Sequence, residues 1–105
     1  MTYRLHDVFT AIADPNRRQI LNYLSENEMP VNEIAGRFHI SRTAVSKHLK
    51  VLQRTNLVYT RQAGRQRIYG LNARPLLEVR NWLQQYEKFW GKRLLNLKNQ
   101  VEKSG

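Results

Sequence analysis

Residues 41–52, SRTAVSKHLKVL, bring together side chains that bind polyanions and one histidine. Arginine and lysine bind phosphates or the O6 and N7 atoms of guanine, and hydroxyl groups bind phosphates or base edges. Histidine adds the chemistry of a metal ligand or a general base. The segment is therefore open to three interpretations: an ordinary amphipathic surface helix, a reactive or metal site built on His48, or a helix that reads DNA. The basic and hydroxyl side chains in question are Arg42, Thr43, Ser46, Lys47 and Lys50.

A helical projection of this segment separates two faces. At about 100° per residue, the aliphatic residues Val45, Leu49 and Leu52 share one face with His48, and every residue on the other face is basic, hydroxyl or amide. The polar face lacks the acidic residues that a solvent-exposed helix normally places four positions from its bases. This arrangement favours a DNA-contacting helix. It also directs His48 inward, as a packed and hydrogen-bonded histidine rather than a metal ligand or base.

The positive charge of the chain is concentrated in its middle. Eighteen Lys and Arg residues against eight Asp and Glu residues give a formal net charge of +10. Residues 41–70 contain seven basic residues and no acidic one, whereas residues 1–40 have a net charge of −1 and residues 71–105 a net charge of +4. A basic block of this kind is typical of a surface that binds nucleic acid. A solvated basic face is the alternative, so the elements that carry these charges must decide.

Two helices are predicted before residue 26. Apolar residues at helical spacing indicate a short first helix over residues 6–13. Asp14 is a good N-cap, and Pro15 suits the first helical position because its missing N–H has no partner there. The second helix should end near Ser25, and residues 26–30, ENEMP, are predicted to form a loop.

The basic segment is predicted to be the second helix of a helix-turn-helix over residues 32–54. Asn32 is expected to cap a short third helix. After a break of a few residues, Ser41 is expected to cap a fourth helix that continues to about Arg54. Two short helices joined by a tight turn, the second strongly basic, have the layout of a DNA-binding helix-turn-helix.

After Asn56 the pattern changes from helix to strand. Residues 57–71 carry β-branched and aromatic residues on both sides of a turn at 63–65, which predicts a two-stranded hairpin, or wing. Arginines on such a ribbon enter a minor groove or grip a DNA backbone. The expected fold class is mainly α with a β-hairpin wing, a single winged helix-turn-helix domain over residues 1–105 in the order α-α-α-α-β-β-α. The wing arginines are Arg61, Arg65 and Arg67.

A long last helix is predicted over residues 74–101, with Pro75 in its first turn. It would be about 42 Å long, whereas a compact domain of this size has a diameter of about 26 Å. An apolar stripe along the whole helix is longer than the core of one such domain can cover. The exposed part of the stripe therefore predicts a partner helix in a dimer. Its members include Leu83, Tyr86, Trp90, Leu94 and Leu97.

The chain resembles the ArsR-type winged-helix repressors of bacteria along nearly its whole length. The resemblance is carried by ADPNRRQILNYL at 13–24, VNEIAGRFHISRTAVSKHLKVL at 31–52, NLV at 56–58 and RQAGRQRIYGL at 61–71. It implies a homodimer whose first and last helices form the interface, with Leu5 and Phe9 on the first. It also implies that the polar residues of 42–50 lie on the recognition helix and that Arg65 and Arg67 lie on the wing. The YEKFWGKRL segment of the last helix is similar to that of the non-metal-sensing branch.

Metal sensing and catalysis are not expected. The chain has no cysteine, which removes thiolate metal sites, cysteine nucleophiles and disulfides. Residues 73–105 contain no histidine or aspartate, so the interfacial metal site of many ArsR-type sensors lacks its ligands. The sequence also has no glycine-rich phosphate loop and no paired catalytic carboxylates. We therefore predict no enzymatic activity, no metal and no cofactor.

The predicted function is sequence-specific repression by a homodimer that binds an inverted-repeat operator in double-stranded DNA, with its own operon among the candidate targets. Two alternatives stay open: a non-specific nucleic-acid-binding module, and a repressor sequestered by a protein partner. The releasing signal, whether an inducer or a protein antirepressor, is also left open. No apolar run approaches the roughly 18 residues of a membrane span, and no secretory leader pattern is present. We expect a cytoplasmic, nucleoid-associated protein without membrane insertion.

Overall fold

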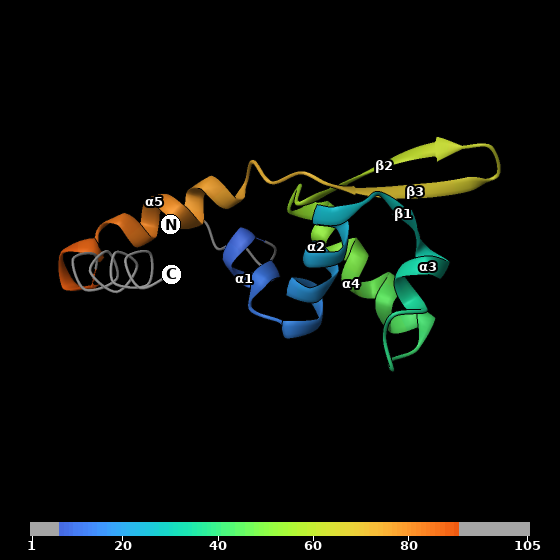
Figure 1. Ribbon diagram of the computed structural model, residues 1–105, viewed down its shortest axis with the longest axis horizontal. Helices are drawn as coiled ribbons and strands as arrows, with labels where there is room; N and C mark the ends of the chain where they lie inside the picture. Colours follow the sequence, from blue (N-terminus) through green and yellow to red (C-terminus); the bar gives the residue numbers. More distant parts are fainter. Residues whose placement is uncertain (1–6, 91–105) are drawn as a thin grey trace, which may run out of the picture.

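The computed structural model describes residues 7–90 of the chain (Figure 1). The elements, in order, are α1 (Val8–Ile12), α2 (Pro15–Glu26), β1 (Met29–Pro30), α3 (Val31–Ala35), α4 (Arg42–Arg54), β2 (Val58–Ala63), β3 (Gln66–Leu71) and α5 (Leu76–Gln84). The predicted mainly helical fold with a β-hairpin wing is confirmed. The wing, formed by β2, β3 and their turn, extends at one end of the molecule, and α5 extends at the opposite end (Figure 1). No helix in this part of the chain is long and apolar enough to cross a membrane.

The first turn of α2 is set by the side chain predicted to cap it. The Asp14 carboxylate accepts hydrogen bonds from the backbone N–H groups of Asn16 (2.8 Å) and Arg17 (3.1 Å), and Pro15 occupies the first helical position. Burial alone would raise the pKa of Asp14. The backbone hydrogen bonds from Arg17 and Asn16, together with the electrostatic influence of His48 and Arg17, nevertheless lower this pKa below its ordinary value of 3.8. The cap is therefore an ionised carboxylate at neutral pH.

The third helix begins earlier than predicted, and Asn32 does not cap it. α3 starts at Val31, directly after Pro30, whose side chain makes no capping hydrogen bond. The ENEMP segment predicted as a loop contains β1, which pairs antiparallel with β3 and makes the sheet three-stranded, in the order β1-β3-β2. A strand of two residues is too short to show the alternation by which strands are recognised. Asn32 is consequently the second residue of α3, and its side chain makes a different contact.

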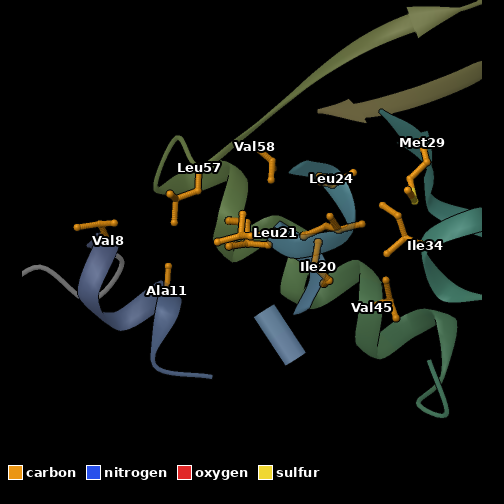
Figure 2. Packing of buried hydrophobic residues seen from close by; sticks show 12 residues of the cluster. Val8, Ala11, Ile20, Leu21, Leu24, Met29, Ile34, Val45, Leu57 and Val58 are labelled. Atoms are coloured by element: carbon orange, nitrogen blue, oxygen red, sulfur yellow. The ribbon is translucent and has the colours of Figure 1, made fainter. Parts of the chain in front are cut away.

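The apolar face of α4 holds this helix in the core. Val45 and Leu52 are fully buried and Leu49 is 1% exposed, and they pack with side chains from α1, α2, α3 and the start of β2 (Figure 2). Burying one aliphatic side chain of this size contributes about 1.5–3 kcal/mol. The buried cluster comprises Val8, Ala11, Ile20, Leu21, Leu24, Met29, Ile34, Val45, Leu49, Leu52, Leu57 and Val58.

The last helix differs from the prediction of one continuous helix over residues 74–101. α5 ends at Gln84, a turn follows at 85–86, and residues 87–90 are again helical. At this turn the side chain of Gln85 donates to the Trp82 carbonyl (3.0 Å), and the Tyr86 N–H donates to the Leu83 carbonyl (2.9 Å). The i→i−3 bond replaces the i→i−4 bond of an α-helix and tightens the chain. The remainder of the predicted helix, from residue 91, lies outside the described residues.

Substitution of the α2 cap should destabilise the fold. Asp14→Ala removes the acceptor for two backbone N–H groups, so we expect the free energy of unfolding to fall by about 1 kcal/mol. Urea unfolding at neutral pH measures this difference.

Asp14→Asn is the matched control, because an amide oxygen accepts the same hydrogen bonds. Since folding lowers the pKa of Asp14, the stabilisation due to its ionisation is present above pH 3.8 and is lost as the pH falls below that value. The Asn variant should lack this loss. Equal stability of the Ala variant and the wild type at neutral pH would contradict the capping role.

Candidate nucleic-acid interface

The first turn of α4 presents the polar face that the sequence predicted. Ser41 caps the helix, with its hydroxyl accepting a hydrogen bond from the Ala44 N–H (3.1 Å), so Arg42 is the first helical residue. Because the apolar face is buried, the opposite face is directed to solvent. Its exposed side chains are Arg42, Thr43, Lys47, Lys50, Gln53 and Arg54, and Ser46 is half-buried among them.

His48 lies on the inner side of α4, as predicted. It is half-buried, and its Nδ1 atom lies 3.3 Å from Nη1 of Arg17. Arginine can only donate, so the imidazole nitrogen is the acceptor. The same guanidinium donates to the backbone carbonyls of Thr10 (3.0 Å) and Ala11 (2.7 Å) at the end of α1. His48 therefore belongs to a contact between helices. Among residues 7–90 no group of three or more His, Cys, Asp and Glu residues is arranged to hold a metal ion.

The wing is a tight hairpin with basic residues at its tip. β2 and β3 pair antiparallel from Val58↔Leu71 to Ala63↔Gln66, which leaves Gly64 and Arg65 as the two-residue loop. Gly64 has a φ of 64°, a conformation that a two-residue hairpin turn requires and glycine adopts without strain. The hairpin thus carries Arg65 in its loop and Arg67 on β3, both exposed, at the end farthest from the core.

A cleft of about 440 Å³ lies between the polar face of α4 and the wing. Its lining includes four positively charged side chains and no acidic one. The cleft is lined by Pro30, Val31, Asn32, Arg42, Ser46, Lys50, Gln53, Arg65, Gln66, Arg67 and Tyr69. A concave surface with one sign of charge concentrates an oppositely charged ligand, and side chains of these types bind phosphates and base edges. The structure therefore brings predicted residues of the helix and of the wing to one concave, positively charged surface. Thr43 and Lys47 are exposed on α4 but are not among the residues that line this cleft.

Arg61 lies on the other face of the wing. In the strand register Arg61 is paired with Ile68, whereas Arg67 is paired with Gln62, and successive side chains point to opposite faces. Nη2 of Arg61 forms a salt bridge with Oε1 of Glu28 at 2.9 Å. The sequence grouped this residue with the other wing arginines because it could not reveal the strand register.

Tyr59 completes this contact on the outer face of the wing. Its hydroxyl also donates to the Glu28 carboxylate. The hydrogen bonds from Arg61 and then from Tyr59 lower the pKa of Glu28 below its ordinary value of 4.5. The Tyr59 ring lies where a Cβ atom on Gly70, its cross-strand partner, would have to be. Glycine at position 70 thus allows the ring to lie flat on the strand and reach Glu28.

A hydrogen bond that the sequence did not predict joins the two helices of the helix-turn-helix. Nε of Arg42 donates to Oδ1 of Asn32 at 2.6 Å. Both residues line the cleft. Asparagine is a common N-cap residue, so no local signal distinguished this contact from capping.

A second exposed surface, rich in aromatic residues, follows α1 and α5. Phe9 packs edge-to-face on Trp82, with ring centroids 5.6 Å apart, and Trp82 packs on Tyr86 at 5.4 Å. Trp90 remains 40% exposed and Phe89 69% exposed. The predicted interface residues Phe9, Leu83, Tyr86 and Trp90 therefore lie on or beside one aromatic surface. Leu5, Leu94 and Leu97 lie outside the described residues.

Comparison with known proteins identifies relatives of this chain. Residues 14–60 match the family described as "Bacterial regulatory protein, arsR family". The HTH-type transcriptional regulator Rv2034 of Mycobacterium tuberculosis is 37% identical over 105 residues, which cover 99% of this chain and 95% of that protein. The transcriptional repressor SdpR of Bacillus subtilis is 35% identical over 79 residues, covering 75% and 88%. The solution structure of Mb0332 from Mycobacterium bovis, a homodimeric winged helix-turn-helix DNA-binding domain, has 27% identity, 80% coverage of both chains and a TM-score of 0.61.

The close contact of Tyr59 with Gly70 generates a stability prediction. Gly70→Ala should displace the end of the exposed Tyr59 ring and break its hydrogen bond to Glu28, which should lower the free energy of unfolding by about 1 kcal/mol. Thermal or urea unfolding measures it.

Gly36→Ala is the matched control, because a Cβ at Gly36 would have its nearest neighbour at 3.4 Å and the backbone there is already helical. We expect that variant to be nearly as stable as the wild type. If Gly70→Ala is equally well tolerated, the ring does not occupy the position described.

Proposed function

Because the chain belongs to the ArsR family of bacterial regulatory proteins and is a transcriptional regulator, we propose that it is a homodimeric repressor of an inverted-repeat DNA operator. Its DNA-binding residues would be Arg42, Thr43, Ser46, Lys47 and Lys50 on α4, and Arg65 and Arg67 on the wing. The observation that carries the proposal is the cleft between α4 and the wing, whose lining has four basic side chains and no acidic one. In this proposal α4 enters the major groove while the wing holds the adjacent backbone or minor groove.

The aromatic surface on α1 and α5 supports the homodimer. Trp82, Leu83 and Tyr86 are 36–47% exposed, although large apolar side chains on a monomer are normally covered. Mb0332, a structural neighbour, is homodimeric. For a dimer with a two-fold axis through this surface to bind two half-sites on one side of B-DNA, the two copies of α4 must lie about 34 Å apart, which is one turn of the duplex. The operator would then be an inverted repeat.

Metal sensing is not part of the proposed function. The sequence has no cysteine, and residues 73–105 have no histidine or aspartate. These compositions remove the thiolate ligands of one sensor class and the imidazole and aspartate ligands of the other. Release from DNA would then follow another signal, such as an organic ligand or a protein partner.

The two faces of the wing allow a matched test of DNA binding. The DNA probe is a duplex that the wild type enriches from a random pool. Arg67→Ala should weaken binding to this duplex on the order of tenfold. If the substitution removes one phosphate contact, the slope of log K against log salt concentration should become shallower by about 0.9. Arg61→Ala removes the same charge from the outer face, where Glu28 already pairs with it, and should change both quantities little. Fluorescence anisotropy at several salt concentrations measures both. Equal losses for the two variants would contradict the assignment of faces.

Loss of the dimer should also abolish operator binding. Leu83→Glu would place a carboxylate in the proposed interface, so we expect monomers in sedimentation at micromolar concentration and loss of tight DNA binding. Gln84→Glu introduces the same charge at the next exposed position of α5 and serves as the control. A Leu83→Glu protein that stays dimeric would exclude this surface as the interface.

A further inference from the structure

The hydrogen bond between Asn32 and Arg42 restrains a side chain at the mouth of the cleft. Asn32 is in α3 and Arg42 is the first residue of α4, so the bond crosses the helix-turn-helix. Its length of 2.6 Å is short for a charge-assisted N–H···O bond. Arginine has no acceptor, so the amide must present its oxygen, which fixes the orientation of the Asn32 side chain as well.

This contact leaves one end of the Arg42 guanidinium for DNA. The group has five N–H donors in a planar fork, and Asn32 uses the donor on Nε. Nη1 and Nη2 then form the remaining pair, at the tip of the side chain. Two parallel donors at this spacing match the O6 and N7 acceptors of guanine in the major groove. A guanidinium that is already oriented loses less conformational freedom when it binds.

The position of Arg42 favours a base over a phosphate. Residues at the N-terminus of a recognition helix are those that contact base edges in the helix-turn-helix arrangement. Arg42 shares the cleft with Ser46 and Lys50, which extend the same face along the helix. A phosphate contact carries no sequence information, whereas a guanine contact requires a particular orientation of the guanidinium. That orientation is the property that Asn32 restrains.

We propose that Asn32 is a positioning residue that orients Arg42 so that Nη1 and Nη2 read a guanine in each operator half-site. The inference rests on the proposed function, because it requires a specific operator. Asn32 itself would not need to touch the DNA. Its effect would appear as selectivity for one base pair rather than as general affinity.

The test begins with a duplex that the full-length wild-type protein enriches from a random pool, and with a scrambled duplex of the same composition. Binding of the wild type, Asn32→Ala and Arg42→Ala is measured on both, and on duplexes with each half-site base pair replaced in turn. Arg42→Ala should reduce discrimination at one G·C pair on the order of tenfold, and Asn32→Ala about three- to tenfold at the same pair. Binding of Asn32→Ala to the scrambled duplex, and its salt dependence, should stay unchanged.

Two controls separate positioning from a merely structural role. Asn32→Asp keeps the acceptor for Nε and should retain the wild-type discrimination ratio, although its charge lowers affinity for every duplex. Replacing the identified guanine with 7-deazaguanine removes the N7 acceptor, so the wild type should lose discrimination and Asn32→Ala should lose little more. Unchanged thermal unfolding of Asn32→Ala confirms that the fold is intact.

Failure of the positioning role of Asn32 and failure of the proposed function give different results. If Asn32→Ala discriminates as well as the wild type, or loses affinity equally on both duplexes, the positioning role is wrong while the proposed function stands. A lower salt dependence for Arg42→Ala without loss of base discrimination assigns Arg42 to a phosphate and also overturns it. If the wild type enriches no sequence at all, the proposed function itself fails.

Discussion

Burial of one face of α4 is the constraint on which the rest of the structure depends. Val45, Leu49 and Leu52 are almost completely inaccessible to solvent, and together they contribute on the order of 5–9 kcal/mol by transfer from water. That energy fixes the rotation of the helix about its own axis. Since the rotation is fixed, the positive side chains on the opposite face need no interaction of their own to stay exposed. The core therefore determines which side chains are available to DNA.

In the wing, strand register determines which side chains face the cleft, as burial does for α4. Alternation along β2 and β3 assigns each arginine to a face, and the pair Glu28 and Arg61 holds the outer face to the chain before β1. The opposite face, with Arg67 and Tyr69, lines the cleft. The Glu28 carboxylate, which pairs with Arg61, is thereby not among the residues that line the basic cleft. The asymmetry of charge between the two faces follows from strand register and one ion pair.

Local signals in the sequence predicted the elements well, and contacts between distant residues were beyond them. The cap at Asp14 and the two faces of α4 depend on neighbours within one or two turns, so spacing alone revealed them. The position of Arg61, the bond from Arg42 to Asn32 and the existence of β1 depend on register or on approach of separate elements. The end of α5 at Gln84 depends on a side chain competing for a backbone carbonyl, which helical periodicity does not encode.

The guanidinium of Arg17 has a geometric consequence for a dimer. It holds the carbonyls at the end of α1 and the imidazole of His48 on α4, so these two helices are fastened to each other. If α1 and α5 pair two protomers, the distance between the two copies of α4 becomes a property of the aromatic surface. The dimer would then accept only operators whose half-sites are separated by this distance. An operator with an extra base pair between its half-sites would be rejected by the packing around Phe9 and Trp82, far from any base.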